Sequence, residues 1–121
     1  MSLGAWICLA LVGGAGAVAR FSIDGAVSAR REGEFPLGTF TINVAGAFVL
    51  GLLTGAAVTG TWLFVVGTGF LGSFTTFSTW IFETERLAED GEEVVAIANL
   101  GIGVAAGLAA AGAGWAIGAL L

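Results

Sequence analysis

Gly69-Phe-Leu-Gly-Ser-Phe-Thr-Thr-Phe-Ser-Thr-Trp80 is the stretch that decides the fold, because it places glycines and hydroxyl residues inside an apolar segment long enough to cross a bilayer. Lipid offers no hydrogen bonds to a peptide group. Irregular backbone at membrane depth therefore persists only where protein buries it or where it lines a cavity. The stretch predicts a broken membrane helix at an ion or solute site.

The composition of the whole chain is that of a polytopic membrane protein. Of its 121 residues, 57% are hydrophobic, and the mean hydropathy is +0.98. Charged residues make up 11% of the chain, against roughly 25% in soluble domains. The chain has no histidine and a single cysteine, Cys8, so a transition-metal site built from side chains is not expected.

Four apolar segments follow one another, at about residues 3–23, 37–58, 62–82 and 94–121. Each is close to or longer than the ~20 residues that a helix needs to span the hydrocarbon core. The connector after the first segment is polar, and the connector after the third carries most of the acidic residues. We predict an all-α membrane protein, with one four-helix transmembrane domain over residues 1–121.

A bundle of four short helices has little interior left for an aqueous path once its side chains interdigitate. A transport path would therefore run between subunits or along the outside of one bundle. Oligomerisation is the physical expectation, and a symmetric or pseudosymmetric dimer is the simplest form.

Two polar side chains interrupt the apolar segments. Arg20 lies near the end of the first segment. A guanidinium costs roughly 2.5–3.5 kcal/mol at the centre of a membrane helix, so Arg20 either attracts an anion, pairs with carbonyl groups or snorkels to the interface. Asn43 lies within the second segment, with Thr39 on the same face. Its amide can donate to an anion or bond a neighbouring helix, and the glycine-rich third segment favours the first interpretation.

Phe74, Phe77 and Trp80 recur every three residues in the third segment, which predicts that they lie along one helix face. Aromatic ring edges are electropositive, so they can line an anion path without a full charge that would trap the ion. Ordinary packing is the alternative for such a stripe. Backbone carbonyls exposed at a helix break can also hold a small cation.

Four blocks of sequence resemble the Fluc (CrcB) family of microbial fluoride channels: residues 13–21, 36–46, 69–83 and 99–108. The resemblance spans essentially the whole chain in the family's order and spacing. It implies a multi-pass protein of the cell membrane that conducts fluoride passively and lowers its cytoplasmic concentration. It also implies an antiparallel dimer of four-helix subunits, with two pores along the interface and a structural sodium ion at the centre.

Carried over by position, the resemblance gives roles to single residues. The backbone carbonyls of Gly72 and Thr75 would hold the sodium ion. Asn43 would be the pore amide, and Phe77 and Trp80 would be the two pore aromatics. No catalytic residue is implied, since conduction is not an enzyme reaction. The further residues in or near the pore would be Thr39, Ser78, Thr79 and Arg20.

Two residues depart from the family's pattern. The second pore aromatic is usually phenylalanine and is Trp80 here. The indole adds bulk and an N–H donor, so it could bind the anion, narrow the path or close it. A serine usually follows about one turn after the Asn99 position, where this chain has Gly103. A non-conducting member of the family is therefore an alternative.

The arginines of the connectors bear on assembly. Arg30, Arg31 and Arg86 fall in the first and third connectors, while the opposite connector and both termini carry no Lys or Arg. This asymmetry favours one orientation, with the first and third connectors in the cytoplasm. The partner is then either a second copy of the chain or an oppositely oriented paralogue. A proton-coupled fluoride transporter is a weaker alternative, because no acidic residue or histidine lies in the middle of a helix.

Overall fold

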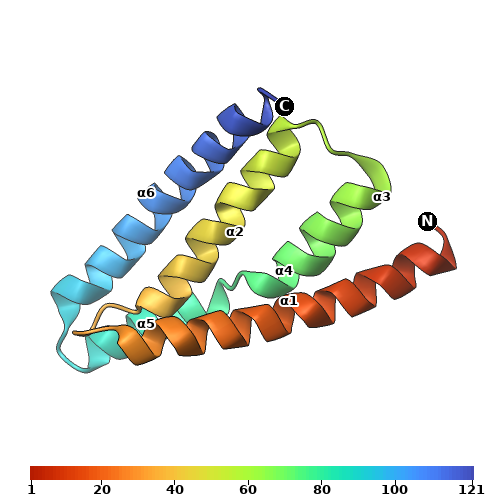
Figure 1. Ribbon diagram of the computed structural model, residues 1–121. Coiled ribbons are helices and arrows are strands. Elements are labelled where there is room, and N and C mark those ends of the chain that lie inside the picture. The colour runs from red at the N-terminus through yellow and green to blue at the C-terminus, as the bar shows by residue number, and fades with distance from the viewer.

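The computed structural model describes residues 1–121 and is entirely helical (Figure 1). The helices form four segments along the chain. The third segment is divided into short pieces, with non-helical backbone at residues 75–77. We refer to residues 75–77 as the break. The prediction of an all-helical chain with a broken third helix is confirmed. The elements are α1 (Leu3–Arg30), α2 (Leu37–Gly55), α3 (Gly60–Trp62), η1 (Leu63–Leu71), α4 (Gly72–Phe74), α5 (Ser78–Glu89) and α6 (Glu93–Gly118).

Three helices, α1, α2 and α6, are long and apolar enough to cross a membrane, which confirms the multi-pass prediction. The third segment is not a continuous span, because the break separates α3, η1 and α4 from α5. Neither half reaches the ~20 residues of a spanning helix. Within the first half, η1 is wound as a π-helix, a form that is rare and often found at functional sites.

Two helices extend into stretches that the sequence suggested were connectors. The first continues past residue 23 to Arg30, because the first residues that stop a helix are Gly33, with φ +86°, and Pro36. The third segment continues past residue 82 to Glu89, ahead of Gly91, with φ +82°. In contrast, α2 and α6 end about a turn before the predicted ends at residues 58 and 121.

Glycines allow α2 and α6 to lie side by side with their backbones in contact (Figure 1). A Cβ atom on Gly51 would lie 2.1 Å from the carbonyl oxygen of Ala111, and one on Gly114 would lie 2.1 Å from that of Phe48. Small residues at such positions are the usual means by which membrane helices pack without a hydrophobic driving force. The α2–α6 pair is therefore the most closely packed part of the fold.

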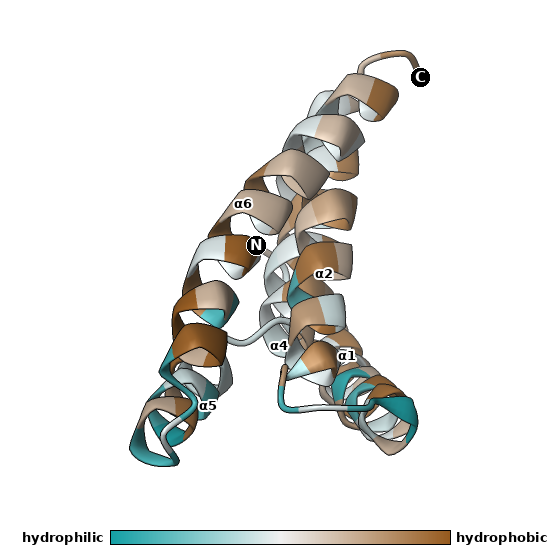
Figure 2. Ribbon diagram, turned by 90° about the vertical axis from the view of Figure 1, so that its left-hand side faces the viewer, coloured by the Kyte–Doolittle hydropathy of each residue, from teal (hydrophilic) through white to brown (hydrophobic).

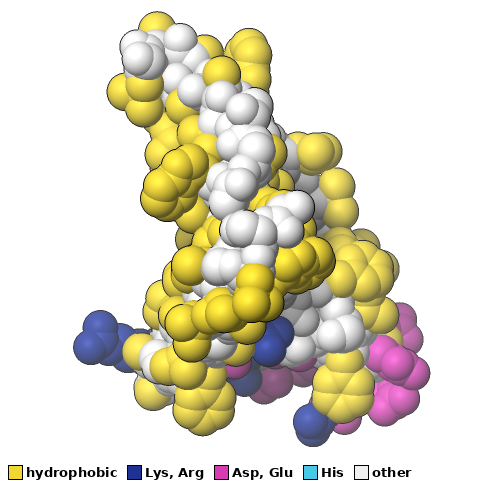
Figure 3. Space-filling model, turned by 90° about the vertical axis from the view of Figure 1, so that its right-hand side faces the viewer, with side chains coloured by type: hydrophobic (Ala, Val, Ile, Leu, Met, Phe, Trp, Pro, Cys, Tyr) yellow, Lys and Arg dark blue, Asp and Glu magenta, His cyan; other side chains and the backbone are white.

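The η1 half of the third segment packs against α1 instead. A Cβ atom on Gly16 of α1 would lie 2.4 Å from the carbonyl oxygen of Phe70. In Figure 1 this pair diverges from the α2–α6 pair, and the two meet near α5. The hydrophilic residues gather at the end of the molecule where the α1–α2 and α5–α6 loops lie (Figure 2), and the charged side chains lie at the same end (Figure 3).

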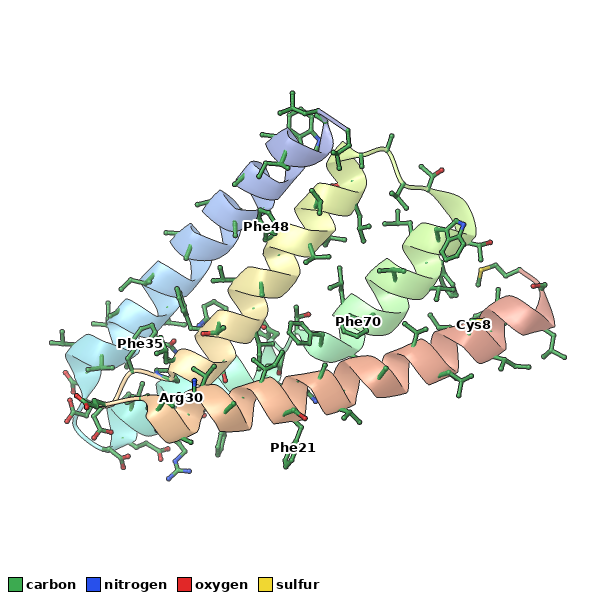
Figure 4. All side chains as sticks on the ribbon, in the orientation of Figure 1. Cys8, Phe21, Arg30, Phe35, Phe48 and Phe70 are labelled. Atoms are coloured by element: carbon green, nitrogen blue, oxygen red, sulfur yellow. The ribbon has the colours of Figure 1, made fainter.

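The isolated chain leaves most of its apolar surface uncovered. Only 17 of 121 residues are buried, far fewer than a water-soluble core would need. Phe21 is 82% exposed and points away from the bundle (Figure 4). Lipid or another subunit must cover such side chains.

Candidate functional site

The break is held in place by two residues of α2. Thr75 is extended, with φ −84° and ψ 161°. Asn43 donates from Nδ2 to the Thr76 carbonyl and accepts from the Thr76 N–H at Oδ1, both over 2.8 Å. One turn along α2, a Cβ atom on Gly46 would lie 2.2 Å from the methyl carbon of Thr75. The absence of a side chain at Gly46 thus lets the break lie directly on α2.

The break frees two backbone carbonyls from helical hydrogen bonds. In a continuous helix the Thr76 N–H would bond the Gly72 carbonyl, but here it bonds Asn43 Oδ1. The Thr79 N–H would likewise bond the Thr75 carbonyl, but it bonds Thr76 Oγ1 over 3.2 Å. These are the two carbonyls that the sequence suggested as cation ligands. Their chemistry fits such a role, because carbonyl oxygens without N–H partners are the usual ligands of Na⁺ at unwound membrane helices.

A cavity of about 520 Å³ opens beside the break. Its walls come from α2, the third segment on both sides of the break, and α6. No charged side chain lines it. Of the predicted site residues, five line this cavity: Asn43, Gly72, Thr75, Phe77 and Trp80.

The two aromatic residues of the cavity pack edge to face. The ring centroids of Phe77 and Trp80 are 5.6 Å apart, with 74° between the planes. The Phe77 side chain is 71% exposed. The Trp80 Nε1–H donates to the carbonyl oxygen of Asn99 on α6 over 3.0 Å, so the indole donor is already used within the protein.

Phe74 does not share a face with Phe77 and Trp80. It precedes the break, is only 6% exposed and stacks on Phe70, with centroids 5.7 Å apart. The expected aromatic stripe is wrong for Phe74, because three-residue spacing places side chains on one face only where the helix is continuous.

Residues 7–115 match the family described as CrcB-like protein, Camphor Resistance (CrcB). The chain belongs to the CrcB family. A relative from Mycobacterium tuberculosis (strain ATCC 25618 / H37Rv), described as fluoride-specific ion channel FluC 2, is 47% identical over 111 residues, which are 92% of this chain and 88% of the relative. Another from Symbiobacterium thermophilum, described as fluoride-specific ion channel FluC 1, is 42% identical over 119 residues, 93% and 96% of the two chains.

The other predicted residues of this CrcB-family chain lie outside the cavity lining. Thr39 is 2% exposed and donates a hydrogen bond to the Glu83 carboxylate. Ser78 is exposed, next to Phe77. The Thr79 N–H donates to Thr76 Oγ1 at the start of α5, and Arg20 is half-buried on α1.

Two residues for which the sequence predicted no role, Asn99 and Thr84, hold α5 and α6 of this CrcB-family chain together. Asn99 is 1% exposed and donates to Thr84 Oγ1 over 2.8 Å. Thr84 in turn donates to the Trp80 carbonyl over 2.8 Å. The available signal was that Asn99 is the one polar side chain in the middle of an apolar helix, where an amide has to find a partner.

Proposed function

We propose that this chain is a fluoride-specific ion channel that conducts passively, lowers the cytoplasmic fluoride concentration and is not an enzyme. Membership of the CrcB family and near full-length similarity to channels described as fluoride-specific support this function. The structural observation that carries it is the uncharged cavity beside a helix break.

The lining chemistry suits a small, strongly hydrated anion. The path must replace water with several donors without binding the ion too tightly. Asn43 uses one amide N–H for Thr76, and the second remains available, since the amide carries two. The ring edges of Phe77 and Trp80 add weak positive potential. We propose Asn43, Phe77 and Trp80 as the pore residues, with exposed Ser78 beside them.

We propose that three of the predicted residues act from outside the cavity lining: Thr39, Thr79 and Arg20. The Thr39 hydroxyl donates to Glu83. The Thr79 N–H donates to Thr76 Oγ1, and the Thr79 hydroxyl accepts from it, at the start of α5. Both threonines hold the pore elements in position from outside the cavity. Arg20 offers positive charge on α1, outside the lining.

We further propose a structural sodium ion at the carbonyls of Gly72 and Thr75. The diverted N–H groups of Thr76 and Thr79 support this placement. When bound, the ion would supply positive charge that compensates the two carbonyl dipoles. The protein's part is to keep both carbonyls free of helical donors.

An antiparallel dimer is the assembly that we propose. The 71% exposure of Phe77 in the isolated chain supports it, because a pore needs this ring to face a partner and not lipid. So does the small buried core of the single subunit. Two copies related by a two-fold axis in the membrane plane would each contribute the same open surface to the interface.

Fluoride efflux from liposomes tests the function. The purified chain is reconstituted in liposomes loaded with fluoride, and efflux is followed with a fluoride electrode against a chloride-loaded control. Rapid efflux of fluoride and not of chloride is expected. Phe77→Leu should slow it, while Phe82→Leu, exposed on α5 outside the cavity, should not. Absence of fluoride efflux from folded protein would refute a channel made from this chain alone.

A heterodimer with an oppositely oriented paralogue is the second candidate. It is favoured by Arg30, Arg31 and Arg86, which lie in or next to the two loops at one end of the molecule. Reporter fusions at the C-terminus distinguish the two assemblies. A single orientation supports the heterodimer, whereas equal numbers of inside and outside C-termini support the homodimer. Proton coupling finds no support in the cavity, because no titratable side chain lines it.

A further inference from the structure

Trp80 lies in a notch on α6 that exists because residue 103 is glycine. A Cβ atom on Gly103 would lie 2.9 Å from Trp80 Nε1 and 3.1 Å from both Cε2 and Cζ2. These distances are below the ~3.5–4.0 Å at which non-bonded atoms attract best. The indole ring is rigid, so it cannot yield to such a methyl group by bending. A side chain at residue 103 therefore requires the whole ring to move.

The ring is also fixed by a hydrogen bond on the side that faces α6. Its N–H bonds the Asn99 carbonyl, one helical turn before Gly103. The Asn99 amide reaches back to Thr84 Oγ1 over 2.8 Å, and Thr84 bonds the Trp80 carbonyl. Both ends of Trp80, the backbone and the indole nitrogen, are thus tied to the same buried residue of α6.

Movement of the ring away from α6 leads toward the cavity beside the break. Trp80, Gly103 and Phe77 line the same cavity, and the Trp80 ring already contacts Phe77 edge to face. An indole pushed off Gly103 would enter this cavity or displace Phe77. It would also lose the bond to Asn99 and present an unpaired N–H to the cavity.

We propose that Gly103 is a positioning residue: it lets the Trp80 indole recess against α6, and this recess keeps the cavity beside Phe77 open to the anion. The inference rests on the proposed channel function. Trp80 and Gly103 then form one matched pair, in which the glycine compensates for the larger aromatic ring. The indole acts as a wall of the path, and its N–H is not a ligand of the anion.

Four variants in the liposome assay test the pair. Gly103→Ala should lower fluoride efflux by roughly tenfold or more, since conduction needs every step of the path open. Trp80→Phe keeps an aromatic edge at the pore and should lower efflux less than Gly103→Ala does. Trp80→Phe combined with Gly103→Ala should restore efflux to the level of Trp80→Phe alone, because the smaller ring avoids the new methyl group. Gly107→Ala is the matched control: it lines the same cavity, but nothing lies within 4 Å of its Cβ position.

A spectroscopic readout tests the packing without any need for conduction. The chain contains four tryptophans, and labelling with 5-fluorotryptophan gives each a ¹⁹F resonance. The one that disappears in Trp80→Phe belongs to Trp80. Gly103→Ala should shift it, and Gly107→Ala should leave it in place.

Each alternative outcome is informative. An unmoved Trp80 resonance in folded Gly103→Ala would contradict the close contact between the indole ring and residue 103. A moved resonance with unchanged efflux, or a double variant that stays blocked, overturns the link between ring position and conduction. Loss of efflux in Trp80→Phe alone would show that conduction needs the indole itself, which contradicts its proposed role as a passive wall of the path. If the unmodified chain releases no fluoride, the channel function fails, and the resonance alone decides the packing.

Discussion

Asn43 and Thr76 are joined by two hydrogen bonds that run in opposite directions, each 2.8 Å long. The side-chain amide thereby replaces both backbone partners that Thr76 would have in a regular helix. An amide carries a donor and an acceptor side by side in one plane, as the Thr76 carbonyl and N–H require. The break in the third segment is therefore stabilised from α2.

Asn43→Asp should disrupt the break more than its small change in shape suggests. At a pH where the new carboxyl is ionised, it still accepts from the Thr76 N–H, but it cannot donate to the Thr76 carbonyl and repels it. An unsatisfied buried polar group costs about 1–3 kcal/mol. We expect a lower thermal unfolding temperature in detergent and loss of fluoride efflux. Thr41→Val, which removes a hydroxyl bonded only within α2, is the control. Wild-type stability in Asn43→Asp would contradict the two-bond arrangement.

Thr76→Ala should weaken the response of the protein to sodium. Without Thr76 Oγ1, the Thr79 N–H is free to bond the Thr75 carbonyl, which then competes with the cation. We expect sodium, compared with N-methyl-D-glucamine, to raise the unfolding temperature of the unmodified protein and to do so less in Thr76→Ala. Thr68→Ala, an exposed threonine of η1, should keep the full difference. An equal response in all three proteins would argue against a sodium site at these carbonyls.

Gly51→Ala should separate α2 from α6. The new methyl carbon would lie 2.1 Å from the Ala111 carbonyl oxygen, and overpacking of this kind costs about 1–3 kcal/mol. Gly112→Ala, on α6 with nothing within 4 Å, should be neutral or gain up to about 1 kcal/mol from helix propensity. Unfolding in detergent with increasing dodecyl sulfate, followed by circular dichroism, measures both. Equal stability of the two variants would show that the helices do not approach as closely as described.

Thr39 and Glu83 should behave as a coupled pair. The buried Thr39 hydroxyl donates to the Glu83 carboxylate, and a hydrogen bond to a charged group contributes about 1.5–3 kcal/mol. Thr39→Val and Glu83→Gln should therefore be non-additive in a double-mutant cycle of unfolding free energies. If Thr39 instead touched the anion directly, its substitution would lower efflux equally with and without Glu83→Gln.

The broken third helix could be predicted from the sequence, because its glycines and hydroxyl residues weaken a helix locally while the flanking apolar residues keep the segment at membrane depth. The ends of α1 and α5 could not be predicted from hydropathy. Residues 24–30 include the polar side chains Asp24, Ser28 and Arg30, yet polarity does not stop a helix, and α1 continues until Arg30. Where a helix leaves the lipid and where it ends are separate properties.

The candidate site could be predicted as a set of residue types but not as a set of contacts. The amide of Asn43 marked α2 as functional, and its bonding to Thr76 depends on how two distant segments dock. Similarly, Trp80 and Gly103 stood out separately, and only their proximity shows that one accommodates the other. One sequence carries no direct information on such pairs.

The dependence of the break on Asn43 also makes the open backbone conditional on the docking of α2. Before α2 docks, the Thr76 N–H has no side chain to bond, and in lipid it must return to the Gly72 carbonyl and close the helix. The open backbone of the third segment therefore depends on contact with α2. A Gly72 carbonyl without a helical donor then marks a chain in which α2 has docked, so a cation bound to it would stabilise the docked chain over the undocked one.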